Sequence, residues 1–192
     1  LIGEDGIHGH SFWKDANIFP TQLAMAASWN PDLVERMGRV TAEEMAPTGI
    51  HETFSPVLCL TRDIRWGRTG ETFGEDPYLI GELGAALIRG YQGRGLDDPT
   101  AVVATAKHYA VHSGPEPERH RFDARVSLKD MRETYLPAFE ALIGELDVAR
   151  GIAAGRLERA GGRLRLTRSG LLVANAVWED LFGVAAPARP VL

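Results

Sequence analysis

Cysteine is almost absent from this chain, because its 192 residues include a single one, Cys59. One thiol permits neither an internal disulfide nor a four-cysteine metal site. Cys59 lies in the apolar run 56–60, and we interpret it as a small buried hydrophobic side chain. Long apolar runs are also missing, and none approaches the roughly 20 residues that a membrane-spanning helix needs. These absences exclude a disulfide-stabilised scaffold and a transmembrane helix.

Neither sign of charge dominates, since 21 Lys and Arg residues stand against 26 Asp and Glu residues, for a net charge of −5. A mildly acidic chain gives no reason to expect nucleic acid or an anionic membrane as a partner. The hydrophobic fraction of 44% and the charged fraction of 24% are typical of soluble globular proteins and exclude a disordered chain. The sequence begins with Leu1 and shows no basic-then-apolar leader. We therefore expect that residue 1 is not the natural start and that any signal peptide lies outside this sequence.

Lysine and histidine are missing from residues 145–192, whereas residues 1–144 hold all three lysines and all six histidines. The first segment carries 14 basic and 21 acidic residues, net −7, and the second carries seven arginines and five acidic residues, net +2. This change in residue usage predicts a domain over 1–144 and a tail of different origin over 145–192.

The first segment alternates between strand and helix patterns. Apolar periodicity predicts helices over 21–29, 31–46, 77–91 and 128–143, with Asn30, Asp76 and Ser127 as N-caps. Strands are predicted over Thr53–Leu60 and Ala101–Ala106. A long polar loop over 61–76 connects the first of these strands to the helix predicted over 77–91. Strands separated by helices are typical of an α/β fold with a parallel sheet.

Polar side chains concentrate where such a fold builds its active sites. His8, Arg65 and the pair Lys107–His108 each follow a predicted strand. The carboxyl ends of parallel strands lie on one rim, so these groups are expected to converge there. Their donors and acceptors suit a polar substrate with many hydroxyl groups.

Four stretches, in order along the chain, resemble glycoside hydrolase family 3, the family of many β-glucosidases and β-xylosidases. They are Asp5–His10 with Ile18–Pro20, Phe54–Val57 with Arg62–Arg68, Glu71–Pro77, and Lys107–Tyr109 with His112–Glu116. Arg119–Phe122 and Thr134–Phe139 also fit, so the resemblance covers about residues 1–143. The stretches His112–Glu116 and Arg119–Phe122 look more like the β-xylosidase and periplasmic β-glucosidase branch of the family than the plant exoglucanase branch.

The resemblance implies a (β/α)₈ TIM barrel that holds the non-reducing-end sugar at its mouth. Because a complete barrel usually needs about 250 residues, the chain is expected to form a partial (β/α)₈ TIM barrel. The implied substrate is a small carbohydrate, a β-glucoside or β-xyloside, and no cofactor is implied. The implied location of the parent protein is periplasmic or secreted. The implied substrate-binding residues are Asp5, Arg65, Lys107, His108, Arg119 and His120.

The roles implied for these residues differ. Asp5 would accept hydrogen bonds from sugar hydroxyls, and Arg65 would donate to a hydroxyl and orient Asp5. Lys107 and His108 would donate to adjacent hydroxyls, and Arg119 or His120 would complete the pocket.

Plainer interpretations remain open for several residues. Asp5 is also compatible with a turn, and Arg65 with pairing to Glu71 or Glu75 inside its own loop. Trp66 is compatible with stacking on a sugar or with packing beneath the pocket.

The remaining histidines and Asp76 are assigned to structure. His8 and His10 have no acidic or cysteine partner at the spacing of a zinc site, so no metal is expected. His51 and His112 are interpreted as structural or loop positions, and Asp76 as a helix cap.

A catalytic residue is missing from the pattern. The family works by a retaining double displacement that uses two carboxylates. Its nucleophile is an Asp in a Ser-Asp-Trp-like segment, and its acid/base Glu usually comes from a later domain; no Asp in this chain has that context. We therefore name no catalytic residue. The leading hypothesis is an N-terminal fragment of a family 3 glycoside hydrolase joined to an unrelated tail; the alternatives are a non-catalytic carbohydrate-binding or interaction module and an inactive relic.

The tail predicts a small helix–hairpin–helix element, similar to a winged helix. Gly155–Glu158, Arg163–Thr167, Ser169–Asn175 and Trp178–Phe182 resemble the C-terminal end of oxygen-independent coproporphyrinogen oxidase-like radical-SAM proteins. An iron–sulfur cluster needs several thiolates, so a single cysteine excludes that chemistry here.

Overall fold

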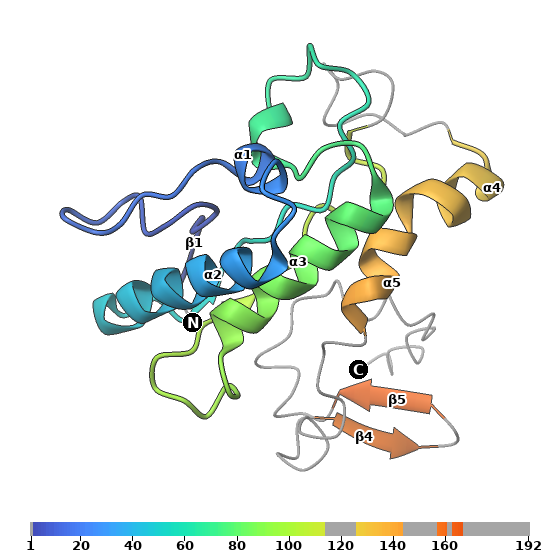
Figure 1. Ribbon diagram of the computed structural model, residues 1–192. Coiled ribbons are helices and arrows are strands. Elements are labelled where there is room, and N and C mark those ends of the chain that lie inside the picture. Colours follow the sequence, from blue (N-terminus) through green and yellow to red (C-terminus); the bar gives the residue numbers. More distant parts are fainter. Residues whose placement is uncertain (1, 114–125, 144–156, 161–162, 167–192) are drawn as a thin grey trace, which may run out of the picture. The chain divides into compact units, whose positions relative to one another are not determined.

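The computed structural model describes residues 2–113, 126–143, 157–160 and 163–166 (Figure 1). The chain divides into two compact units, Leu1–Glu145 and Leu146–Leu192.

A three-stranded parallel sheet lies in the first unit. Its strands are β1 (Gly3–Glu4), β2 (Glu52–Thr53) and β3 (Val103–Ala104), in the order β1-β2-β3. The register places Gly3 opposite Glu52 and Glu52 opposite Val103. Helices separate the strands in the sequence, as a parallel sheet requires. The predicted α/β fold with parallel strands is therefore confirmed.

The second strand is shorter than the predicted span Thr53–Leu60. Pro56 has no amide hydrogen to donate, so the regular ladder cannot continue through it. Pairing returns just beyond, where the Leu58 amide donates to the Lys107 carbonyl at 2.6 Å and the Lys107 amide donates to the Pro56 carbonyl at 2.9 Å. Residues 57–60 are fully buried, so the apolar run forms part of the core as expected.

Three helices begin close to where the sequence predicts. They are α1 (Gln22–Ala26), α2 (Pro31–Met45) and α3 (Pro77–Gln92). Asn30 caps α2 by accepting from the Leu33 amide at 3.0 Å, and Asp76 caps α3 by accepting from the Leu79 amide at 2.9 Å. A proline follows each cap, where its missing amide hydrogen costs nothing. The predicted caps Asn30 and Asp76 are confirmed.

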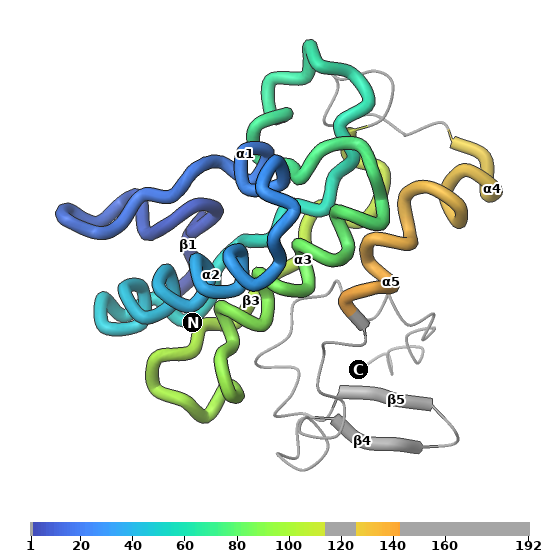
Figure 2. Tube along the Cα trace, viewed as in Figure 1, coloured from blue at the N-terminus to red at the C-terminus, as the bar shows by residue number. Residues whose placement is uncertain are grey.

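Helices α2 and α3 lie side by side (Figure 2). Glycines stand at their contact and make this approach possible. A Cβ added at Gly38 would come within 2.8 Å of the Leu87 carbonyl oxygen, closer than real Cβ atoms approach. The absence of that Cβ lets the two backbones approach and bury the apolar sides of both helices. Val34 and Met45 of α2 and Leu83 of α3 are buried.

Short helical turns complete the first unit. A 3₁₀ turn, η1 (Ala46–Thr48), follows α2, and another, η2 (Thr69–Glu71), interrupts the polar loop 61–76. The helix predicted over 128–143 is divided into α4 (Leu128–Asp130), a π turn η3 (Met131–Tyr135) and α5 (Pro137–Ile143).

The division of this helix has a local cause. Pro137 cannot donate a backbone hydrogen bond, and the Leu136 amide instead donates to the Met131 carbonyl at 2.9 Å, a wider turn. Ser127 still caps the segment by accepting from the Asp130 amide at 3.0 Å. Helix α5 packs on α3 and buries Phe139.

The second unit contains an antiparallel pair of strands, β4 (Leu157–Ala160) and β5 (Arg163–Leu166). Leu157 pairs with Leu166 and Ala160 with Arg163. The helices predicted on either side of this hairpin lie outside the described residues. No helix among the described residues is long and apolar enough to cross a membrane.

Candidate functional site

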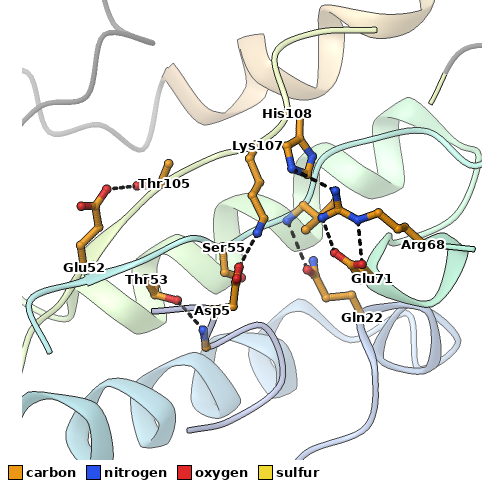
Figure 3. Close-up of polar contacts among 12 residues, drawn as sticks. Asp5, Gln22, Glu52, Thr53, Ser55, Arg68, Glu71, Thr105, Lys107 and His108 are labelled. Carbon is orange, nitrogen blue, oxygen red and sulfur yellow. Dashed lines mark hydrogen bonds and ion pairs between the residues drawn. The ribbon is translucent and has the colours of Figure 1, made fainter. Parts of the chain in front are cut away.

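An ion pair joins two residues that lie 102 positions apart in the sequence. Asp5 directly follows β1 and Lys107 lies shortly after β3, so the parallel strands bring both to one edge of the sheet. Lys107 Nζ lies 2.5 Å from Asp5 Oδ1 (Figure 3). The Lys107 side chain is 15% exposed and that of Asp5 is 48% exposed. The lysine is therefore largely enclosed, while the carboxylate still faces solvent.

Buried hydrogen bonds fix the segment that carries Asp5. The Gly6 amide donates to Thr53 Oγ1 at 3.1 Å, which ties the segment to β2. The Tyr91 hydroxyl donates to the Gly6 carbonyl at 2.8 Å and lies 3.0 Å from Ser55 Oγ. Burial raises the pKa of Tyr91, so its hydroxyl keeps the proton that it donates. Asp5 is consequently held in place by its neighbour Gly6.

Arg68 lies at the same edge, between an acid and a histidine (Figure 3). Its Nε and Nη2 donate to the two carboxylate oxygens of Glu71 at 2.8 and 2.6 Å. This bidentate bond raises the pKa of Arg68 and lowers the pKa of Glu71. Arg68 Nη1 lies 3.4 Å from His108 Nε2. A guanidinium has no acceptor atom, so His108 Nε2 is the acceptor in this contact.

The other ring nitrogen of His108 faces the single cysteine. With Nε2 accepting, Nδ1 carries the hydrogen and donates to Cys59 Sγ at 3.4 Å. The backbone amide of His108 donates to the same sulfur, also at 3.4 Å. Burial, then nearby His112 and Arg68, lower the pKa of His108 to about 3, which keeps the imidazole neutral. Burial raises the pKa of Cys59 to about 11, so the sulfur is a thiol.

Arg65 lies differently from the expectation. Its Nη2 and Nε donate to the Asp63 carboxylate at 2.5 and 2.9 Å, and 82% of its side chain is exposed. Arg65 also lowers the pKa of Asp63 to about 2 through these hydrogen bonds. The arginine that contacts His108 is Arg68, three residues further on. Glu71, one of the two acids suggested as a partner of Arg65, is bound by Arg68.

The histidines assigned to structure have mixed surroundings. His10 is buried between Glu4, at 2.9 Å, and Thr48, at 3.0 Å, so it ties the N-terminal segment to η1. His8 Nδ1 is buried without a hydrogen-bond partner among the described residues. The ring of His112 stacks on that of His108, with 4.0 Å between ring centroids.

Trp66 is 4% exposed and packs with Val57 and Cys59. This burial supports packing rather than stacking on a sugar. Arg119 and His120, the last two predicted site residues, lie outside the described residues.

The structure places Asp5, Lys107 and His108 at one edge of the sheet, and it adds Arg68 and Cys59 as neighbours of His108 that the sequence did not suggest. One signal for Arg68 was present, since a Glu at position 71 is close enough along the chain to hold its guanidinium. No pattern in the sequence connects Cys59 with His108, because the two residues are 49 positions apart.

Comparison with known proteins shows the family of this chain. Residues 1–154 match the Glycosyl hydrolase family 3 N terminal domain. The chain is 35% identical over 166 residues to a xylan 1,4-beta-xylosidase of Xylanibacter ruminicola, with 78% of this chain and 19% of the relative aligned. It is 32% identical over 168 residues to a periplasmic beta-glucosidase of Salmonella typhimurium, with 88% and 21% aligned.

A solved structure extends the likeness to the fold. It is that of a beta-glucosidase involved in saponin metabolism from intestinal bacteria, with a TM-score of 0.72 and 51% sequence identity. The superposition covers 76% of this chain and 20% of that one. The chain thus spans about a fifth of the length of its relatives. The matched segment includes every described residue of the site, and the chain belongs to glycosyl hydrolase family 3, whose N-terminal domain, a TIM-barrel-like α/β fold, is matched by residues 1–154.

Proposed function

We propose that Asp5, Arg68, Lys107 and His108 bind the non-reducing-end sugar of a β-glucoside or β-xyloside. The observation that carries this proposal is the Asp5–Lys107 ion pair at the carboxyl edge of the sheet, with Asp5 about half exposed. Carboxylate, ammonium, guanidinium and imidazole groups together supply the acceptors and donors that a ring of hydroxyls needs.

The described contacts assign a task to each group. Asp5 accepts from sugar hydroxyls, and Lys107 keeps two of its three N–H donors for a neighbouring hydroxyl while it holds Asp5. A hydroxyl both donates and accepts, so one that lies at Arg68 and His108 receives a hydrogen from the guanidinium and gives one to Nε2. His108 therefore acts first as an acceptor, whereas the sequence suggested a donor.

The activity proposed for the whole protein is that of an exo-acting, retaining glycoside hydrolase. The names of the relatives, a xylosidase and several glucosidases, support the β-xyloside and β-glucoside alternatives. A retaining mechanism needs a nucleophile and an acid/base carboxyl about 5–5.5 Å apart. Asp5 is engaged by Lys107 and is assigned to binding, so the residues described here orient the sugar and leave bond cleavage to carboxylates not identified in this sequence.

Three finer assignments remain proposals. Arg119 or His120 would complete the pocket. The strands β1 to β3 with α2 and α3 would form consecutive βα units of a (β/α)₈ barrel, which their parallel order supports.

Third, residues 145–192 would form a tail of different origin, similar to the C-terminal end of oxygen-independent coproporphyrinogen oxidase-like radical-SAM proteins. The compact unit Leu146–Leu192 and its β4–β5 hairpin support it. The family match, which extends to residue 154, moves the end of the family segment about ten residues beyond the change in composition.

Calorimetric titration of the full 192-residue chain with methyl β-D-glucoside and methyl β-D-xyloside tests the binding proposal. Asp5→Asn and Lys107→Met should each weaken binding at least tenfold, because a hydrogen bond to a charged group is worth roughly 1.5–3 kcal/mol. Asp63→Asn is the matched control, because Asp63 lies in the polar loop and pairs with Arg65. This variant should bind the glycosides like the original chain. No binding of either glycoside by a folded chain, or equal losses in Asp5→Asn and Asp63→Asn, would refute the proposal.

A further inference from the structure

Three metal-ligating side chains meet in the first unit: Cys59, His108 and His112. Within the part of the chain that the structure describes, the ligand atoms of these three residues all lie within 4.8 Å of one another. Cys59 comes from the run after β2, and the two histidines come from the segment after β3. From this cluster we propose that Cys59, His108 and His112 form a Zn²⁺ site.

The separations between the ligand atoms match those around zinc. Cys59 Sγ lies 3.4 Å from His108 Nδ1 and 3.9 Å from His112 Nδ1. In a tetrahedral site, Zn–S bonds of about 2.3 Å and Zn–N bonds of about 2.0–2.1 Å put sulfur and nitrogen about 3.6 Å apart. The two distances in the structure bracket that value. The two sulfur–nitrogen separations therefore suit the metal, and the adjustment that binding needs is a change in the orientation of the two imidazole rings.

The kinds of ligand also suit zinc. One thiolate and two imidazoles are ligands that zinc prefers over magnesium or calcium, which select oxygen. Three protein ligands leave a fourth position for water, as in open zinc sites. The His108 backbone amide donates to Cys59 Sγ at 3.4 Å and would remain to stabilise the thiolate as an outer partner.

The step itself balances without a co-reactant. The S–H bond of Cys59 breaks, its proton leaves to solvent, and a Zn–S bond forms while zinc keeps its oxidation state. The hydrogen on His108 Nδ1 moves to Nε2, which frees the Nδ1 lone pair for the metal. The stacked rings of His108 and His112, inclined by 20°, must open to direct both lone pairs at one ion.

The sequence analysis considers a metal site at His8 and His10 and expects no metal there. The proposed zinc site uses three other residues. Zinc would use Nδ1 of His108 and leave a hydrogen on Nε2, so the contact in which Nε2 accepts from Arg68 would be given up when zinc binds. The proposal does not depend on sugar binding, because the metal alone is the probe.

Titration of the full, reduced chain with Co²⁺ as a spectroscopic substitute for Zn²⁺ tests the proposal. Because Cys59 is the single cysteine in the sequence, a thiolate-to-cobalt charge-transfer band reports this site alone. We expect one Co²⁺ per chain, a tetrahedral ligand-field spectrum, and displacement of Co²⁺ by Zn²⁺. Cys59→Ser should abolish the band, and His112→Gln should weaken Co²⁺ binding at least tenfold. The matched control, His51→Gln, removes an exposed histidine outside the cluster and should leave binding unchanged.

Two results would overturn the site. One is the absence of a charge-transfer band at millimolar Co²⁺ in a chain whose circular dichroism shows that it is folded. The other is a band whose affinity is the same in His112→Gln as in the original chain, since this would show a thiolate that binds metal without the imidazole.

Discussion

Two arginines three residues apart have opposite surroundings. Arg68 is about 29% exposed and is held between Glu71 and His108, whereas Arg65 is 82% exposed and is held by Asp63. An exposed ion pair contributes little to binding or stability, and a partly enclosed bidentate one keeps its guanidinium in one orientation. At the scale of single residues, these contacts favour Arg68 over Arg65 for the proposed sugar contact.

Paired substitutions separate these two arginines. Arg68→Lys should weaken binding of methyl β-D-glucoside or methyl β-D-xyloside by about tenfold or more, because an ammonium cannot hold Glu71 through two parallel bonds and reach His108 as well. Arg65→Lys should change the dissociation constant less than about twofold, as expected for an exposed pair. Calorimetric titration of both variants gives the comparison. A larger loss of glycoside affinity in Arg65→Lys than in Arg68→Lys would show that Arg65 contacts the sugar, as expected from the sequence.

Glu71 should make stability depend on pH in a defined direction. Its pKa is lowered in the folded chain, so its contribution is present above the ordinary glutamate pKa, about 4.3, and is lost as the pH falls through the lower folded-state value. Glu71 is partly exposed, so that contribution is about 1 kcal/mol or less.

Urea unfolding from pH 7 to pH 3 measures this dependence. The stability difference between the original chain and Glu71→Gln should be constant above about pH 5.5 and shrink below about pH 4.3. A difference that stays the same down to pH 3 would show that Glu71 acts only through packing.

At the scale of elements, the contact between α2 and α3 fixes the helices that cover the sheet. Gly38→Ala should destabilise the chain by about 1 kcal/mol or more, because its Cβ meets the Leu87 carbonyl oxygen and backbone cannot easily move away. The gain in helix propensity, about 1 kcal/mol, offsets part of this cost.

The melting temperature measures this effect against a matched glycine. Gly38→Ala should lower Tm by roughly 3 °C or more. Gly70→Ala adds a Cβ that meets no heavy atom within 4 Å and should leave Tm nearly unchanged. A Gly38→Ala chain that melts at or above the original temperature would contradict the close packing of α2 and α3.

Helices were easier to predict than strands for a physical reason. A helix is determined by local signals, and Asn30, Asp76 and the prolines after them mark the starts of α2 and α3 directly. Strand length depends on pairing with distant residues, which the run after Thr53 does not reveal. The helix over 128–143 was divided because Pro137 outweighs an apolar periodicity that continues through it.

At the scale of the whole molecule, the parallel sheet explains which part of the site could be predicted. Asp5 directly follows β1 and Lys107 lies shortly after β3, so their meeting follows from strand order. Arg65 and Arg68 lie in a long loop, where side-chain direction depends on turns and local partners such as Asp63. The position of a residue relative to a strand end can be predicted from the sequence, whereas its orientation within a loop cannot.

The chain by itself should not hydrolyse a chromogenic β-glucoside or β-xyloside. No Asp in its sequence has the context of the family nucleophile, and loss of a nucleophile lowers kcat by roughly 10⁶ in a well-studied hydrolase. Against a typical kcat of about 10 s⁻¹, such a rate is undetectable in an ordinary assay. Turnover above about 0.01 s⁻¹ by the purified chain, abolished by an inhibitor of retaining glycosidases, would show that a nucleophile is present after all.

A crystal structure of the full chain with methyl β-D-glucoside tests the central claim most directly. The account predicts a pyranose whose hydroxyls lie within hydrogen-bond distance, about 2.5–3.2 Å, of Asp5, Lys107 and the pair formed by Arg68 and His108. Arg65 should remain with Asp63 and away from the sugar. A glycoside bound at another place, or one that contacts Arg65 and leaves Asp5 and Lys107 untouched, would contradict it.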